Sequence, residues 1–179
     1  ERSVKKAEEI AKALKKLSAK VQVGYVFRPM PVINRLKQAM KDDKIHLLSS
    51  MYCCGISISL NMPQWFYDKA KSGGALVDQA THNLDLLRYL FGEVADVRAL
   101  AENPVHKKKK GYTVDEVITL VFRFENGILA SHIHTWVGDT WRNEITLSGE
   151  KRLYRLLPAQ GKLAVEQTVQ VIKGQDKDK

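Results

Sequence analysis

Long apolar runs and a cysteine framework are both missing from the sequence. No apolar run reaches the ~18 residues that a membrane-spanning helix needs, and the charged start ERSVKK does not have the pattern of a signal peptide. The two cysteines, Cys53 and Cys54, are neighbours. Neighbouring residues of a strand point to opposite faces, so we expect free structural thiols and no disulfide between them. These absences argue against membrane-spanning and disulfide-scaffold proteins, and free thiols fit a cytoplasmic location.

Acidic residues are in the minority. The chain has 20 Asp and Glu against 29 Lys and Arg, which gives a net charge of +9. Such a balance can indicate nucleic acid or an anionic substrate as a partner. Here the basic excess is spread along the chain, and its one dense run, Lys107–Lys110, has no interleaved aromatic residues. We therefore expect a solvated lysine loop, no nucleic acid partner and no membrane partner.

Helical spacing of apolar residues occurs twice near the start of the chain. Residues 3–17 show it with Ser3 as the expected N-cap, and residues 32–41 show it after Pro31, which suits a first helical turn. Between these segments, residues 21–27 (VQVGYVF) form a short apolar run that is typical of a strand.

Strand-like patterns dominate much of the rest of the chain. Residues 46–60 alternate an apolar face with a face of small residues, which predicts one long strand. After Gly92 nearly every segment is typical of a strand, and residues 125–127 (ENG) indicate a hairpin turn. Helices first and consecutive strands later predict an α+β fold: a large, mostly antiparallel open sheet with helices on one face. The expected strands are ADVRALAE, VDEVITLVFRFE, ILASHIHTWV, NEITLSGE, RLYRLL and LAVEQTVQVI.

The two faces of the expected sheet differ in character. One face should pack under the helices, and the other is too apolar for plain exposure yet too mixed for a core. We therefore expect a homodimer or homotetramer built through this open face. The packed face has Ile118, Leu120, Phe122 and Phe124, and the open face has Val117, Thr119, Val121 and Arg123, with Val165, Val169 and Val171 on the last strand.

The stretch from Gly73 to Gly92 has the clearest pattern of a functional site. Asp78, His82, Asp85 and Tyr89 follow one another at steps of four, three and four residues. In one helix these side chains fall within an arc of roughly 60°. A solvated helix face is the alternative, but such a face usually has Lys, Glu and Gln, and this one has none. A carboxylate one turn from an imidazole suits general acid–base chemistry near neutral pH.

Two further patterns are weaker. His132 and His134 share one face of an expected strand, so they could bind zinc with Asp78 or His82, as in a zinc hydrolase. Two histidines on a half-buried sheet surface are the alternative. Arg28 stands at the end of the expected strand 21–27, where ligands often bind, although a plain surface arginine fits equally well.

Three segments resemble the Gfo/Idh/MocA oxidoreductases, the group of glucose–fructose oxidoreductase and inositol dehydrogenase. Residues 65–94 (WFYDKAKSGGALVDQATHNLDLLRYLFGEV) match the family's Trp, glycine run, Asp-x-x-x-His-x-x-Asp and closing Leu-x-Gly, with Ala75 in place of the third glycine. Residues 23–31 (VGYVFRPMP) resemble its strand ending in Arg-Phe-x-Pro, and residues 3–14 (SVKKAEEIAKAL) resemble the helix before that strand. The resemblance is to the C-terminal part of the family.

The resemblance implies an enzyme of two parts. Residues 1–27 would be the last helix and strand of a dinucleotide-binding Rossmann domain, and residues 28–179 an α+β substrate and oligomerisation domain. The sequence has neither the GxGxxG fingerprint nor the Glu-Lys-Pro motif that supplies the family's catalytic lysine. NAD or NADP would then be bound mainly by the missing domain, and this fragment alone would be inactive.

The same resemblance implies roles for individual residues. His82 matches the base that takes the proton from a substrate hydroxyl, and Asp78 matches the acid that orients the substrate and His82. We expect Arg28, Trp65 and Asp85 to complete a binding site for a sugar, polyol or related hydroxy compound, without a metal. A naturally truncated, non-catalytic binding or dimerisation module is the alternative function.

Overall fold

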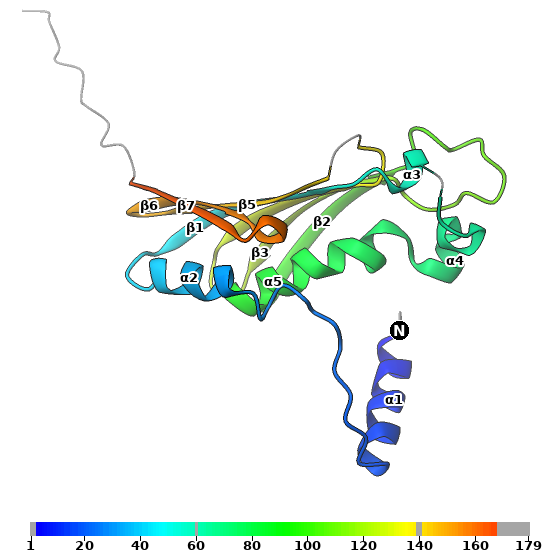
Figure 1. Cartoon of the computed structure of the whole chain (residues 1–179), viewed down its shortest axis with the longest axis horizontal. Coiled ribbons are helices and arrows are strands. Elements are labelled where there is room, and N and C mark those ends of the chain that lie inside the picture. Colours follow the sequence, from blue (N-terminus) through cyan, green and yellow to red (C-terminus); the bar gives the residue numbers. More distant parts are fainter. Residues whose placement is uncertain (1–2, 60, 139–140, 168–179) are drawn as a thin grey trace, which may run out of the picture.

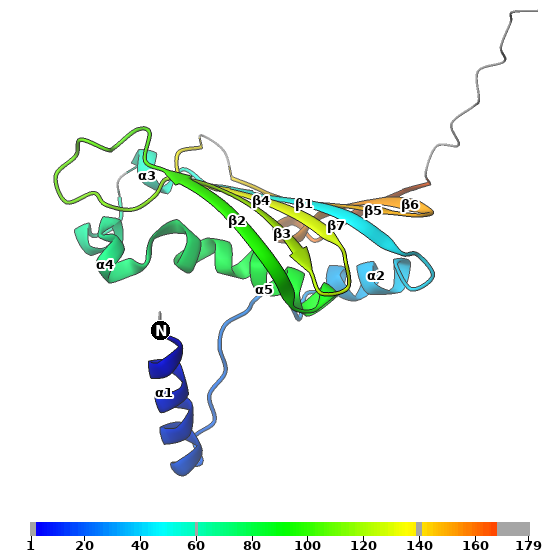
Figure 2. The same cartoon turned by 180° about the vertical axis from the view of Figure 1, so that it is seen from behind.

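The computed structural model describes residues 3–59, 61–138 and 141–167 (Figure 1). Its centre is a seven-stranded sheet in the order β2-β3-β4-β1-β5-β6-β7. Helices α2, α4 and α5 lie on one side of this sheet in both views, and in the described residues no helix lies across its other face (Figures 1 and 2). The predicted α+β fold with a large, mostly antiparallel open sheet is therefore confirmed.

The strands occupy most of the second half of the chain, as predicted. They are β1 (Ile45–Cys53), β2 (Val94–Glu102), β3 (Val117–Phe124), β4 (Leu129–Thr135), β5 (Arg142–Gly149), β6 (Arg152–Leu157) and β7 (Lys162–Gln167). The predicted Val169 and Val171 lie outside the described residues. The helical segments are α1 (Val4–Lys16), α2 (Pro31–Ala39), α3 (Ile56–Ser59), η1 (Gln64–Tyr67), α4 (Lys69–Ser72), η2 (Leu76–Ala80), α5 (Thr81–Phe91) and η3 (Pro158–Gln160).

The pairing of β1 with β4 is parallel, whereas the other five strand pairs described are antiparallel. Its register runs from Leu47 opposite Leu129 to Cys53 opposite Thr135. Parallel pairing brings the C-terminal ends of both strands to the same edge of the sheet. The residues that follow β1 and β4 therefore meet beneath the segment that leads into α5.

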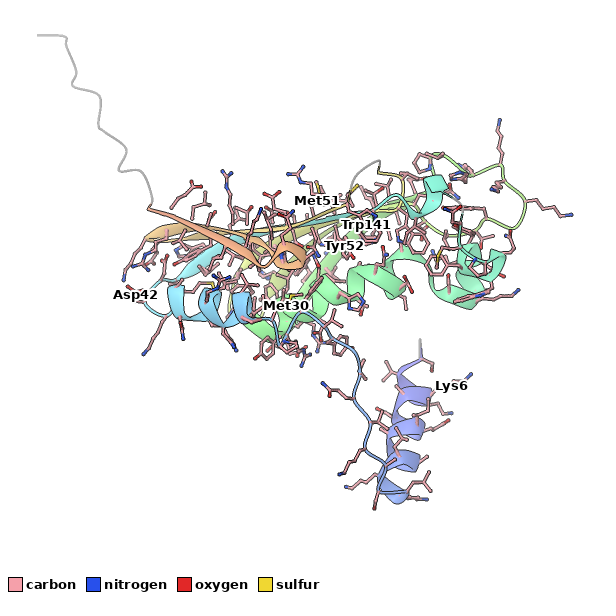
Figure 3. The ribbon with its side chains drawn as sticks, viewed as in Figure 1. Lys6, Met30, Asp42, Met51, Tyr52 and Trp141 are labelled. Atoms are coloured by element: carbon pink, nitrogen blue, oxygen red, sulfur yellow. The ribbon has the colours of Figure 1, made fainter. Side chains whose placement is uncertain are left out.

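The two faces of the sheet follow the predicted alternation. Ile118, Leu120, Phe122 and Phe124 of β3 are buried on the face that packs under the helices, whereas Val121 is exposed on the other face. Figure 3 shows the same alternation at the end of β1, where Met51 and Tyr52 project to opposite sides of the sheet. Burial of the apolar face is the main stabilising contribution to a sheet of this kind.

Strand β1 is shorter than the predicted strand 46–60. It ends at Cys53, and residues 56–59 form one helical turn, α3. A Cβ on Gly55 would lie 2.7 Å from the carbonyl oxygen of Gly138, so the chain passes very close to the segment after β4. The peptide N–H groups of Cys54 and Ser57 then donate to carbonyl oxygens at the end of β4 and directly after it, at 2.9 and 3.0 Å. This contact turns the chain out of the strand.

The predicted strand at residues 21–27 does not form, although the helix before it does. Helix α1 begins after Ser3, whose hydroxyl accepts from the N–H of Lys6 at 3.4 Å, but none of its residues is buried. Figure 1 shows α1 apart from the sheet. A strand needs a neighbouring strand to supply hydrogen-bond partners, and no described strand lies beside this segment.

Three smaller predictions are confirmed. Cys53 and Cys54 are not joined in a disulfide. Lys107–Lys110 are all exposed, as expected for a solvated loop. The turn between β3 and β4 contains Gly127 at a φ of 89°, a conformation that favours glycine. Within the described residues, no helix has the length and apolar character required to cross a membrane.

Candidate active site

A glycine pair and a π turn set the position of the predicted site helix. Helix α4 ends at Gly73, and both Gly73 and Gly74 have positive φ angles, 84° and 73°. Residues 76–80 then form a π-helical turn in which the N–H of Thr81 reaches back to the carbonyl of Leu76. The sequence predicted an ordinary helix here. π turns are rare and are frequently found at functional sites.

Asp78 lies in this π turn and His82 in the first turn of α5. Asp78 is exposed and His82 is half-buried, with its Nδ1 atom out of contact with solvent. Burial raises the pKa of the Asp78 carboxyl, and the nearby imidazole of His82 opposes that rise. The imidazole also packs edge-on against Phe27, with ring centroids 5.9 Å apart. His82 therefore lies neither in the apolar core nor free in solvent.

Two predicted binding residues, Arg28 and Asp85, are brought together. The Nε atom of Arg28 donates to Oδ2 of Asp85 at 2.7 Å, and Nη2 donates to Oδ1. This hydrogen bond is the main cause that raises the pKa of Arg28. Asp85 lies on α5 one turn after His82. The ion pair therefore fixes the segment between α1 and α2, here called the entry segment, against helix α5.

Aromatic rings flank the guanidinium of Arg28. Its Cζ lies 5.0 Å from the ring centre of Tyr25 and 5.2 Å from that of Tyr89. Lys37 lies on Tyr89 as well, 4.1 Å from the ring centre. Cations over aromatic faces are attracted by the ring quadrupole. The tyrosines and Arg28 line a cleft of about 560 Å³ together with Val21, Gln22, Val23 and Pro29.

Trp65 lies on η1 and is 52% exposed. Its ring packs edge-on against Phe66, with centroids 5.8 Å apart. Within the described part of the chain it has no ring contact or hydrogen bond with Asp78, His82 or Arg28. Its predicted place in the binding site is thus a proposal.

An aromatic cluster on the inner face of the sheet was not predicted. The ring of Tyr52 packs edge-on against His134 at 5.3 Å and tilts against Trp141 at 6.3 Å. Figure 3 shows Tyr52 and Trp141 on the side of the sheet that faces α5. Burial raises the pKa of Tyr52, and the negative charge of Asp78 adds to the rise. The parity of Tyr52 was visible in the sequence, but its parallel pairing with His134 was not.

A buried polar network lies between the sheet and α5. The amides of Asn83 and Asn143 donate to each other, both at 3.0 Å, and Asn83 also donates to Ser50. The hydroxyl of Ser50 in turn lies 3.0 Å from Nδ1 of His132. The one sequence signal was Asn83 itself, a polar residue at helical spacing between the apolar Ala80 and Leu87.

The histidine pair on β4 is fully buried. His132 and His134 are both 0% exposed, and their rings stack with centroids 5.9 Å apart. Burial lowers the pKa of His132 to about 4 and that of His134 to about 3, so both are neutral at pH 7. Among the described residues no group of three potential metal ligands forms, so the structure offers no support for the zinc alternative.

Comparison with known proteins identifies the domain. The sequence model of the GFO/IDH/MocA C-terminal domain matches residues 34–155. A levoglucosan dehydrogenase from Pseudarthrobacter phenanthrenivorans is 29% identical over 133 residues, which cover 61% of this chain and 34% of the relative. An uncharacterized protein from Schizosaccharomyces pombe is 29% identical over 91 residues, which cover 51% of this chain and 24% of that protein.

Solved structures share the fold. The structure of a levoglucosan dehydrogenase with NADH and levoglucosan has a TM-score of 0.75 and 23% identity, covering 93% of this chain and 48% of its own. A UDP-N-acetylglucosamine 3-dehydrogenase from Acidithiobacillus ferrooxidans has a TM-score of 0.72 and 18% identity, covering 94% and 50%. The chain thus spans about half the length of these structures, and less of the curated relatives. Since the family's sequence model covers more than half of the chain, the chain belongs to the GFO/IDH/MocA oxidoreductase family through its C-terminal domain.

Proposed function

We propose that this chain is the substrate-binding and oligomerisation domain of an NAD- or NADP-dependent oxidoreductase that acts on a sugar, polyol or related hydroxy compound. The observation that carries the proposal is the placement of Asp78 and His82 on the π turn and the first turn of α5. A levoglucosan dehydrogenase of the same fold has been solved with NADH and levoglucosan, and also with L-sorbose.

The proposed chemistry begins with proton transfer at His82. A neutral imidazole accepts the proton of a substrate hydroxyl, while the neighbouring Asp78 carboxylate stabilises the imidazolium that results. The C–O bond gains double-bond character as the proton leaves. The reaction is complete only when the hydride of the same carbon is accepted, which is the chemistry that a nicotinamide supplies.

Arg28, Trp65 and Asp85 are proposed to bind the substrate around this centre. Arg28 and Asp85 bind each other through Nε and Nη2, so Nη1 of Arg28 is the group best placed to donate to a substrate oxygen. A guanidinium held between two tyrosine rings keeps a fixed direction, which favours selective recognition of hydroxyl groups.

The described residues do not themselves fit a dinucleotide. A pyrophosphate needs a glycine turn at the start of a helix, where peptide N–H groups and the helix dipole bind its negative charge. Gly73 and Gly74 have the required backbone freedom, but the Asp78 carboxylate follows within two turns and would repel a phosphate. We propose that a separate dinucleotide-binding domain holds NAD or NADP.

The open face of the sheet is proposed as the oligomer interface. Leu100, Val121, Leu129 and Leu47 are each more than half exposed on this face. Leu47, Val121 and Leu129 line a shallow hollow of about 410 Å³. A stable interface in which another copy covers such a patch buries more than ~1,000 Å². Val165 does not belong to this face, because it pairs with Tyr154 on the helix-covered side.

The test of the proposed function is a dehydrogenase assay of the complete enzyme. Sugars and polyols are offered with NAD or NADP, and His82→Gln and Asp78→Asn are compared with the wild type. We expect kcat to fall by about 10²–10⁴-fold for His82→Gln, because a positioned proton acceptor contributes that much. His46→Gln, which changes an exposed histidine of β1, is the matched control. Wild-type protein that reduces neither cofactor with any substrate would favour the non-catalytic module.

A further inference from the structure

Gln79, directly after Asp78, ties the π turn to the sheet. Its Oε1 atom accepts from the indole Nε1 of Trp136 at 2.8 Å and from the thiol of Cys54, also at 2.8 Å. Cys54 follows the end of β1, and Trp136 follows the end of β4. One side-chain oxygen is therefore bound to the ends of both parallel strands.

We propose that Gln79 is a positioning residue that holds the π turn, and with it Asp78, in register with His82. The inference rests on the proposed function, since it assigns Gln79 a part in the same site. Gln79 acts through Asp78 and does not itself take part in proton transfer.

The π turn depends on such a tie, because its own ends supply little. No side chain caps its first residue, and the chain before it contains two glycines with positive φ. π-helical hydrogen bonding is rarely stable outside a packed context. If the turn relaxed to α-helical bonding, one residue would leave the turn, and Asp78 would shift around the helix axis relative to His82.

The anchor at the far end of the tie is rigid. Trp136 is 0% exposed and stacks on Phe66 at 4.8 Å and 17°. Its peptide N–H also donates to the carbonyl of Glu116 at 2.9 Å. A donor fixed on both its ring and its backbone fixes its acceptor.

The second donor remains protonated, as a donor must. Cys54 is 0% exposed, and burial raises the pKa of its thiol to about 11. The thiol therefore keeps its proton throughout the physiological range and can donate to Gln79. This gives the buried, unreactive Cys54 a specific task in the fold.

Two substitutions test the tie from opposite ends. Gln79→Met keeps the length of the side chain but removes the acceptor, and Trp136→Phe keeps a ring on Phe66 but removes the indole donor. Gln64→Met is the matched control, because the amide of Gln64 binds a carbonyl of an exposed loop, that of Gly111, at 2.8 Å.

The direct readout is amide hydrogen exchange at Thr81 in this chain. Its N–H closes the π turn on Leu76, so we expect exchange at least about tenfold faster in Gln79→Met and in Trp136→Phe, and no change in Gln64→Met. Carbon-13 titration of the Asp78 carboxyl should show its raised pKa moving back toward that of an ordinary aspartate in both variants. Unchanged exchange in both variants overturns the inference.

In the complete enzyme, the effects of the two substitutions on kcat should not be additive, because both remove the same hydrogen bond. We expect each to lower kcat about 10–100-fold with KM changed less than about threefold, and the double variant to be no worse than either single one. Additive losses, or unchanged kcat in both, would overturn the inference. A wild-type enzyme without dehydrogenase activity would instead refute the proposed function, and Thr81 exchange would still decide whether Gln79 holds the turn.

Discussion

Arg28 and Asp85 form a two-pronged ion pair, with Nε and Oδ2 2.7 Å apart, across the boundary between the entry segment and helix α5. The two partners differ in environment: the Arg28 side chain is 42% exposed and that of Asp85 only 8%. Water can therefore solvate the cation if its partner is removed, but it cannot easily reach the carboxylate.

This difference predicts unequal effects of removing either partner. Arg28→Ala should lower the Tm more than Asp85→Asn, because it leaves a buried carboxylate without its cation. The double variant should unfold at a higher temperature than Arg28→Ala alone. Thermal unfolding of the wild type, the two single variants and the double variant at pH 7 measures this. Arg88→Ala, which breaks the exposed pair of Arg88 with Glu93, is the control for loss of a surface pair. Equal losses of Tm in the two single variants would contradict it.

The free energy of unfolding of the domain should fall as the pH is lowered from about 6.5 to 5, which is above the pH range in which ordinary carboxylates titrate. His132 and His134 stay neutral in the fold, with pKa values of about 4 and about 3, whereas an unfolded histidine titrates near ~6.5. Their contribution is full above about pH 6.5 and is lost as the pH falls toward 4. We expect a loss of about 2 kcal/mol per histidine between pH 6.5 and pH 5.

Denaturant unfolding at several pH values checks this, with His134→Phe as the informative variant. That substitution removes one buried imidazole, so the slope of stability against pH between 5 and 6.5 should fall by about half. His46→Gln, which changes an exposed histidine, is the control. A slope that His134→Phe does not alter would show that this imidazole does not resist protonation.

A charge on the open face of the sheet should separate the oligomer. Val121 is 52% exposed at the centre of β3, and a lysine there would bury an unpaired charge in the proposed interface. Val121→Lys should give a monomer by light scattering, with little change in Tm. Glu125→Lys, in the exposed turn after β3, is the control. A wild-type chain that stays monomeric at high concentration would refute the interface.

The isolated chain should bind neither NAD nor NADP measurably. The described residues provide no pyrophosphate-binding turn, and the carboxylate of Asp78 follows the two glycines. Titration calorimetry with each dinucleotide measures this directly. A micromolar dissociation constant for either cofactor would contradict the assignment of cofactor binding to a separate domain.

Periodicity predicted most of the fold. The alternation of Ile118, Leu120, Phe122 and Phe124 was enough to assign the buried face of β3, because side chains of a strand must alternate between faces. The spacing from Asp78 to His82 was likewise enough to place both on one side of a helical segment. Each of these features is decided by residues that are close in sequence.

The features that sequence did not predict depend on distant partners. The parallel pairing of β1 with β4 places Tyr52 opposite His134, and nothing local to either residue specifies it. The hydrogen bonds of the π turn span five residues instead of the four of an α-helix, and the four-residue spacing of Asp78 and His82 does not distinguish the two. Strand β1 ends early because Gly55 meets Gly138, a contact between residues far apart in the chain.

The parallel pair also has a consequence for how the domain folds. Leu47 meets Leu129 only after the chain between them has closed a loop that contains α5, β2 and β3. Closing long loops costs conformational entropy before the contacts return any stability, and it slows folding. Cys54 and Trp136 reach Gln79 through this pairing, so the site should assemble late on the folding pathway. Antiparallel hairpins such as β3–β4 can form well before it.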